Sequence, residues 1–112
     1  MKTPLTKEEK SRIPFVKALI RKSGDKYISA RKICRMIDKH KPLSDAKMTG
    51  ARLRKMLHYA RINEPNKNKV IIASSFGYKY TRDKAEIKRY AISLSERAEQ
   101  IVRLAKAVSK AV

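Results

Sequence analysis

Residues 83–112 contain neither glycine nor proline, and their apolar side chains recur at a fixed spacing. From Ile87 to Val112 the steps alternate between four and three residues, a period of 3.5 that is typical of a helix with a heptad seam. Asp83 is suited to cap such a helix at its start. The pattern therefore predicts one long C-terminal helix, and it leaves residues 1–82 to supply a compact domain.

One edge of this seam carries branched aliphatic side chains, and the other carries mostly alanine. Small side chains let two helices approach closely, so we predict a homodimer held through the C-terminal helix. The alternative is that the helix covers its own domain, because Val102 and Leu104 widen the apolar stripe. The predicted dimer contacts are Ile87, Ala91, Leu94, Ala98, Ile101, Ala105 and Val108.

The chain carries a large positive charge that is concentrated in its first two-thirds. It has 29 Lys and Arg residues against 10 Asp and Glu, a net charge of +19, of which residues 1–81 hold +15. Repulsion between these positive charges opposes compaction of the chain. Binding to a polyanion such as nucleic acid would neutralise them. Hydrophobic residues make up 42 % of the chain, which excludes a disordered basic tail.

No combination of residues matches a catalytic or metal site. Cys34 is the only cysteine, and it falls on an apolar helical stripe, which indicates a thiol packed in the core. His40 and His58 have no partners at metal-ligand spacing. Three glycines do not build a phosphate-binding loop, and no acidic pair suits acid–base catalysis. We therefore predict no enzymatic activity, cofactor, metal or small-molecule substrate.

The sequence also lacks the features of membrane and exported proteins. Its longest uncharged run, residues 70–78, is far shorter than the ~20 residues that span a bilayer. No apolar signal region follows Met1. A membrane-surface role is disfavoured by Glu86, Glu96 and Glu99, because anionic lipid favours unbroken basic faces. We expect a cytoplasmic, nucleoid-associated protein of a bacterium or a phage-infected host, with no membrane partner.

Three helices are expected before the last one. Residues 6–9 have the form of a capping box, but Pro14 suits only a first turn, so the first helix is expected from residue 11 or 12 to 22. Residues 1–10 are assigned to an N-terminal extension. The second helix is expected from Ala30 to about residue 40, capped by Ser29, and the third from about residue 49 to 62.

The third helix is expected to have two distinct faces. Its apolar face carries Leu53, Met56, Leu57 and Ala60, and its polar face carries Arg52, Lys55, His58 and Tyr59 with Arg54 at the flank. Residues 63–68 follow as a polar loop. Two strands, residues 70–74 and 78–80, then form a hairpin around a turn at residues 74–77, where Gly77 supplies a positive φ angle.

The fold class is thus mainly α with a small β-hairpin (α+β). The element order resembles the winged helix-turn-helix family, and in particular small winged-helix proteins of phages and prophages with a Ser-Ser-x-Gly-Tyr wing. Residues 27–29, 49–57 and 72–78 carry the resemblance. Residues 41–48 depart from it as a long turn, with room for an extra helical turn. The resemblance implies a winged-helix domain over residues 11–82 and a C-terminal helix over residues 83–112.

The resemblance implies a sequence-specific binder of double-stranded DNA, acting as a transcriptional regulator or as a replication or recombination accessory of a phage or mobile element. The third helix would enter the major groove, and the wing would follow the adjacent backbone or minor groove. For Phe76, the alternatives are insertion into a groove or stacking on a base, and packing on the domain. The predicted DNA-binding residues are Ser29, Arg31, Lys32, Lys47, Thr49, Arg52, Arg54, Lys55, His58, Tyr59, Lys69, Ser74, Ser75, Phe76, Lys79 and Arg82. The alternative function is an RNA-binding protein of ribosomal or antitermination type.

Overall fold

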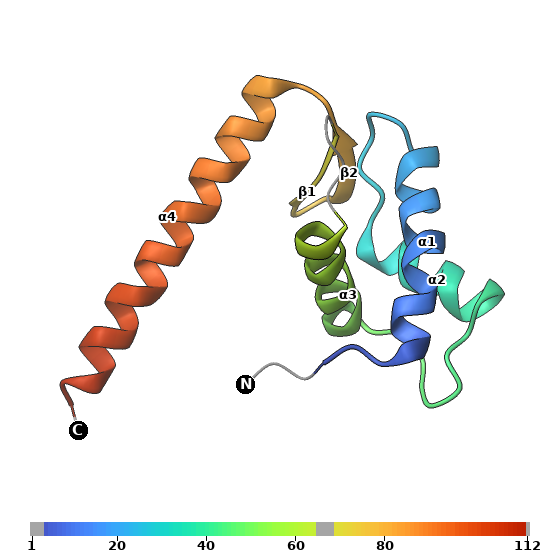
Figure 1. Ribbon diagram of the computed structural model, residues 1–112, viewed down its shortest axis with the longest axis horizontal. Helices are drawn as coiled ribbons and strands as arrows, with labels where there is room; N and C mark the ends of the chain where they lie inside the picture. Colours follow the sequence, from blue (N-terminus) through green and yellow to red (C-terminus); the bar gives the residue numbers. More distant parts are fainter. Residues whose placement is uncertain (1–3, 65–68, 112) are drawn as a thin grey trace. The chain divides into compact units, whose positions relative to one another are not determined.

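The computed structural model describes residues 4–64 and 69–111 of the chain. In this part of the chain the elements are α1 (Lys7–Lys22), α2 (Ala30–His40), α3 (Gly50–Asn63), β1 (Val70–Ser74), β2 (Gly77–Thr81) and α4 (Lys84–Ser109) (Figure 1). The prediction of a mainly helical fold with a small antiparallel hairpin is therefore confirmed. The chain divides into two units, Met1–Thr81 and Arg82–Val112.

The first helix begins earlier than the sequence predicted. α1 starts at Lys7, because the Thr6 hydroxyl accepts the Glu9 amide at 3.0 Å and the Glu9 carboxylate accepts the Thr6 amide at 2.9 Å. Pro14 lies inside the helix on its exposed side, so the expected start near residue 11 is wrong. Glu9 and Ile13 are buried, and this burial together with the capping box outweighs the hydrogen bond that Pro14 removes.

The bounds of α2 and α3 agree with the prediction to within one or two residues. The Ser29 hydroxyl accepts the Lys32 amide and the Thr49 hydroxyl accepts the Arg52 amide, both at 3.1 Å, so both caps are present. The connecting residues 41–49 contain bends and no helical turn. Side chains of α1 hold this segment instead: the Arg12 guanidinium donates to the carbonyl oxygens of residues 41 and 42, at 2.7 and 2.8 Å.

The hairpin has the predicted strands and turn. Val70 pairs with Thr81, and Ser74 pairs with Gly77, whose φ of 128° is the expected positive angle. Ile28 adds a single-residue bridge, since its amide and carbonyl exchange hydrogen bonds with Tyr78 at 2.8 and 2.9 Å. A Cβ at position 77 would lie 2.1 Å from the Ile28 carbonyl oxygen, so the close approach also requires glycine. Of the predicted polar loop, residues 65–68 lie outside the described residues.

The core of the first unit lies between α1, α2, α3 and the hairpin. Isoleucines dominate it, and its fully buried side chains include Ile13, Val16, Ile20, Ile33, Ile37, Leu53, Met56 and Leu57. Cys34 is half-buried and packs against this core, as predicted. Burial raises the pKa of the Cys34 thiol, and the nearby Asp38 carboxylate raises it further. The thiol is therefore held in its protonated, unreactive form.

The second unit is the single helix α4. The Asp83 carboxylate caps it as predicted, accepting the Ala85 amide at 2.9 Å. No residue of α4 is buried. Along the heptad seam Leu94 is 42 % exposed and Ile101 is 66 % exposed. Taken by itself, the helix thus carries an apolar stripe with exposed side chains at Leu94 and Ile101.

Candidate nucleic-acid interface

Most acidic side chains of the first unit form ion pairs with basic side chains of the same unit. Ion pairs join Glu8 to Arg12, Glu9 to Arg52 and Lys55, Asp45 to Arg52, and Glu64 to Lys17. Each of these pairs involves α1 or the first turns of α3. Four of the six acidic residues of the unit therefore form ion pairs with basic residues of α1 or of the first turns of α3. The other two, Asp25 and Asp38, have no ion pair among the described residues.

Glu9 is the buried centre of this arrangement, with 1 % of its surface exposed. One carboxylate oxygen accepts from Arg52 Nε at 2.9 Å, and the other accepts from Lys55 Nζ at 3.3 Å and from the Thr6 amide. Burial alone would raise the pKa of Glu9, but the Thr6 amide and the two basic side chains outweigh it and lower the pKa below its ordinary value. Glu9 is thus held as a carboxylate, and its hydrogen bond raises the pKa of Arg52.

Because of this contact, the face of α3 that is available to a partner differs from the face predicted from the sequence. Arg52 and Lys55 point to Glu9 on α1, and the Lys10 ammonium lies 5.3 Å from the centre of the Tyr59 ring, which packs against the core. These three predicted DNA-binding residues therefore contact α1. The expectation that they form the exposed face, with Arg54 at its flank, is wrong: Arg54 is exposed, and Ala51, Arg54 and His58 form the outward ridge of α3.

A second basic ridge runs along α2. Arg31, Arg35 and Lys39 follow one another at intervals of four residues, all three are exposed, and none has an acidic partner in the described part of the chain. Side chains spaced by four residues lie on one face of a helix. Only Arg31 was predicted to bind DNA. The regular spacing was visible in the sequence, but the missed residues sit outside the segment that resembles a recognition helix.

The remaining predicted DNA-binding residues outside the hairpin do not form one cluster in the sequence: some are exposed cations and two are helix caps. Lys32 and Lys47 are exposed, and neither has an ion pair within residues 4–64 and 69–111. The hydroxyls of Ser29 and Thr49 accept the amide hydrogen bonds that cap α2 and α3. Arg82 is exposed and belongs to the second unit.

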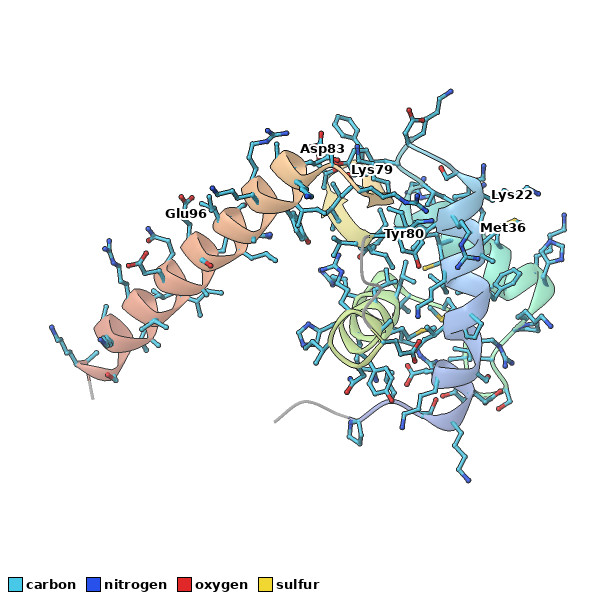
Figure 2. All side chains as sticks on the ribbon, turned by 45° about the horizontal axis from the view of Figure 1, so that its top comes forward. Lys22, Met36, Lys79, Tyr80, Asp83 and Glu96 are labelled. Atoms are coloured by element: carbon cyan, nitrogen blue, oxygen red, sulfur yellow. The ribbon has the colours of Figure 1, made fainter. Side chains whose placement is uncertain are left out.

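The basic side chains of the hairpin lie over aromatic rings. The Lys79 ammonium is 4.8 Å from the centre of the Tyr27 ring, and the Lys69 ammonium is 4.5 Å from the centre of the Tyr80 ring. Figure 2 shows Lys79 and Tyr80 on β2. Such cation–π contacts orient each amine without neutralising its charge.

The turn of the hairpin presents an aromatic side chain to solvent. Phe76 is 74 % exposed, so the alternative in which it packs on the domain is wrong. Its ring centre lies 6.3 Å from that of Tyr27. The Ser74 hydroxyl accepts the Phe76 amide at 3.0 Å and so shapes the turn, while Ser75 is exposed beside it.

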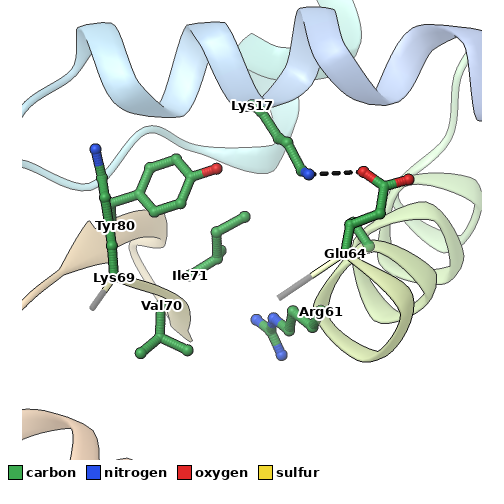
Figure 3. Close-up of a pocket in the computed structure, with 8 residues that line it drawn as sticks. Lys17, Arg61, Glu64, Lys69, Val70, Ile71 and Tyr80 are labelled. Carbon is green, nitrogen blue, oxygen red and sulfur yellow. Dashed lines mark hydrogen bonds and ion pairs between the residues drawn. The ribbon is translucent and has the colours of Figure 1, made fainter. Parts of the chain in front are cut away.

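A small cavity of about 50 Å³ lies between α1, the end of α3 and the hairpin. Figure 3 shows Lys17 donating to the Glu64 carboxylate across it, at 2.7 Å, and the Tyr80 hydroxyl pointing into it. That hydroxyl is buried and makes no hydrogen bond within the described residues. The cavity is large enough to hold a water, and the Tyr80 hydroxyl offers that water a hydrogen-bonding partner, so we assign the cavity a structural role.

Comparisons with known proteins add no relative: no family model, curated protein or solved structure matches the chain. Within the described residues, no three His, Cys, Asp or Glu side chains are grouped closely enough to hold a metal ion. None of the helices in the same residues has both the length and the apolar character needed to cross a bilayer.

Proposed function

We propose that this protein binds double-stranded DNA, with α3 in the major groove and with α2 and the hairpin on the flanking phosphates. The observation that supports this best is the separation of charge in the first unit. Four of its six acidic residues pair with Arg12, Lys17, Arg52 and Lys55. The exposed cations of α2 and Arg54 of α3 have no ion-pair partner among the described residues. A surface of this kind attracts phosphate by releasing bound counterions.

The outward ridge of α3 carries residues that are suited to contact base edges in the major groove. Gly50 and Ala51 are small and exposed at its start, and no neighbouring atom lies within 4 Å of the place where Gly50 would carry a side chain. The helix backbone can therefore approach base edges closely. Arg54 lies one turn further along, and an arginine at this place bonds the paired acceptors of guanine.

The order of the elements supports the same proposal. Two packed helices, a hairpin directly after the second of them and a bridge from Ile28 to β2 follow the order expected of a winged helix. We propose that a protein with this order of elements acts in the cytoplasm, as a regulator of transcription or as an accessory of replication or recombination. Two copies joined through α4 would read two half-sites together.

A competition measurement tests the proposal. The full chain is bound to a labelled duplex and challenged with unlabelled duplex DNA, single-stranded DNA and structured RNA. We expect duplex DNA to compete best, and we expect Arg54→Ala to weaken binding more than Arg103→Ala, a matched change at an exposed arginine of α4. Equal or better competition by RNA would favour the ribosomal or antitermination alternative instead.

A further inference from the structure

A groove of about 500 Å³ lies beside the hairpin in the first unit, among the end of α1, the bridging residue Ile28, the start of α2 and the turn. Its apolar lining comes from Leu19, Ile28 and Met36. Tyr27 and Phe76 supply two aromatic rings at one side. Figure 2 shows two of the lining residues, Lys22 on α1 and Met36 on α2. The volume falls in the range of about 300–1,000 Å³ that is usual for small-molecule sites.

The charge around this groove has one sign. Lys22 and Lys32 line it, and no acidic residue does. Neither lysine has an ion pair within the described part of the chain. An apolar, aromatic hollow with a cationic rim is complementary to a ligand that joins a flat aromatic ring to an anion. A nucleotide has this chemistry, whereas an acidic peptide segment would leave the aromatic rings without a matching partner.

The aromatic side of the groove is held in place before a ligand arrives. The Ile28–Tyr78 hydrogen bonds, at 2.8 and 2.9 Å, fasten the hairpin to the start of α2. Gly77 lies close to Ile28, since a Cβ at position 77 would be 2.1 Å from the Ile28 carbonyl oxygen. These contacts anchor the backbone of the turn that presents Phe76, with 74 % of its surface in water. An anchored backbone lowers the ordering cost when a base stacks on the ring.

From this geometry we infer that the groove receives one unpaired base of bound DNA. The base stacks on Phe76 beside Tyr27, and the adjoining phosphates lie near Lys22 and Lys32. The inference rests on the proposed function, because the DNA is brought to the groove by α3 and the hairpin. A paired base must first be extruded at a cost, so the groove favours DNA in which a base is already unpaired.

The test compares two duplexes of the same sequence, one fully paired and one with a single extra, unpaired adenosine, by fluorescence anisotropy with the full chain. We expect the bulged duplex to bind about tenfold more tightly, the effect of one base–aromatic stack. Phe76→Ala should abolish this gain, so that the bulged and the paired duplex bind with equal affinity, because the ring on which the base stacks is removed. Ile92→Ala, at an exposed apolar residue of α4 that does not line the groove, should keep the gain.

A second readout uses 2-aminopurine as the unpaired base. Stacking quenches its fluorescence, so binding of the unaltered chain should dim the probe and binding of Phe76→Ala should leave it bright. Equal affinity for the two duplexes, or a gain that survives Phe76→Ala, would overturn the inference while duplex binding still stands. Failure to bind either duplex would overturn the proposed function and the inference together.

Discussion

Arg52 donates from Nε to the buried carboxylate of Glu9 at 2.9 Å, and this pair joins the first turn of α1 to the first turn of α3. The same carboxylate closes the capping box of α1 through the Thr6 amide. Glu9 thus caps one helix and fixes the position of another. Because the pair holds one side of α3 against α1, it leaves the opposite ridge, with Arg54, facing solvent.

Replacing Glu9 by glutamine should destabilise the first unit. The amide retains the shape of the side chain but leaves Arg52 and Lys55 without their charged partner at a buried position. We expect Glu9→Gln to lower the free energy of unfolding by about 1–3 kcal/mol in urea denaturation. Glu96→Gln, at an exposed glutamate of α4, is the control; it should change the same free energy by less than about 1 kcal/mol.

The contribution of Glu9 should disappear in acid. Its pKa is lowered in the folded chain, despite burial, by the Thr6 amide, Arg52 and Lys55. A carboxylate of this kind contributes its full stabilisation above the unfolded-state pKa of about 4.3, and that contribution is lost as the pH falls through the folded value. The stability difference between the unaltered chain and Glu9→Gln should be constant near neutral pH and shrink below about pH 4. A difference that grows on acidification would contradict this assignment.

The sequence was sufficient for features that depend on local signals. Ser29 and Asp83 are capping residues beside apolar helical stripes, and Gly77 ends a β-branched run, so α2, α4 and the hairpin were predicted closely. The start of α1 was missed although its capping box at residues 6–9 is a local signal, because Pro14 was expected to lie in the first turn. The exposed face of α3 was missed because it depends on a contact between Glu9 and Arg52, which are 43 positions apart. Helical periodicity separates polar from apolar faces, but it does not reveal that a buried carboxylate covers part of the polar face.

Arg54 and Arg52 should therefore behave differently when each is replaced by alanine. Arg54→Ala should relax base preference and cost roughly 1–3 kcal/mol on the best DNA site without loss of folding stability. Arg52→Ala should lower stability, because it leaves the Glu9 carboxylate buried with one partner fewer. Binding selections on randomised duplexes and urea denaturation separate the two effects. If Arg52→Ala loses base preference but keeps its full folding stability, then Arg52 contacts the bases of DNA.

The basic ridge of α2 should contribute to affinity without contributing to base preference. If about six phosphates are neutralised, the logarithm of the binding constant should fall with the logarithm of the salt concentration at a slope of roughly −5. Arg35→Ala should weaken binding to all duplexes alike and make this slope shallower by about one. Lys88→Ala, at an exposed residue of α4, is the control and should leave the slope unchanged. A flat salt dependence would contradict phosphate binding by the first unit.

The last prediction concerns α4, whose apolar stripe keeps a period of 3.5 residues from Ile87 to Val112. A helix that covers its own domain tends toward a period of 3.6, so the seam favours pairing with a second copy of the chain. Alanines at every second seam position bury little surface, and the pair should therefore be weak and dependent on concentration. Two joined first units would then favour DNA half-sites about 10 base pairs apart.

Two single substitutions in the full chain test this pairing. Ile101 lies in the seam and Ile92 lies outside it, although both are exposed apolar residues of α4. In sedimentation velocity at increasing protein concentration, Ile101→Glu should remain monomeric, because the pair would bury two carboxylates side by side. Ile92→Glu should self-associate like the unaltered chain. If the unaltered chain is monomeric at every concentration, both free and on DNA with paired half-sites, then α4 does not join two copies.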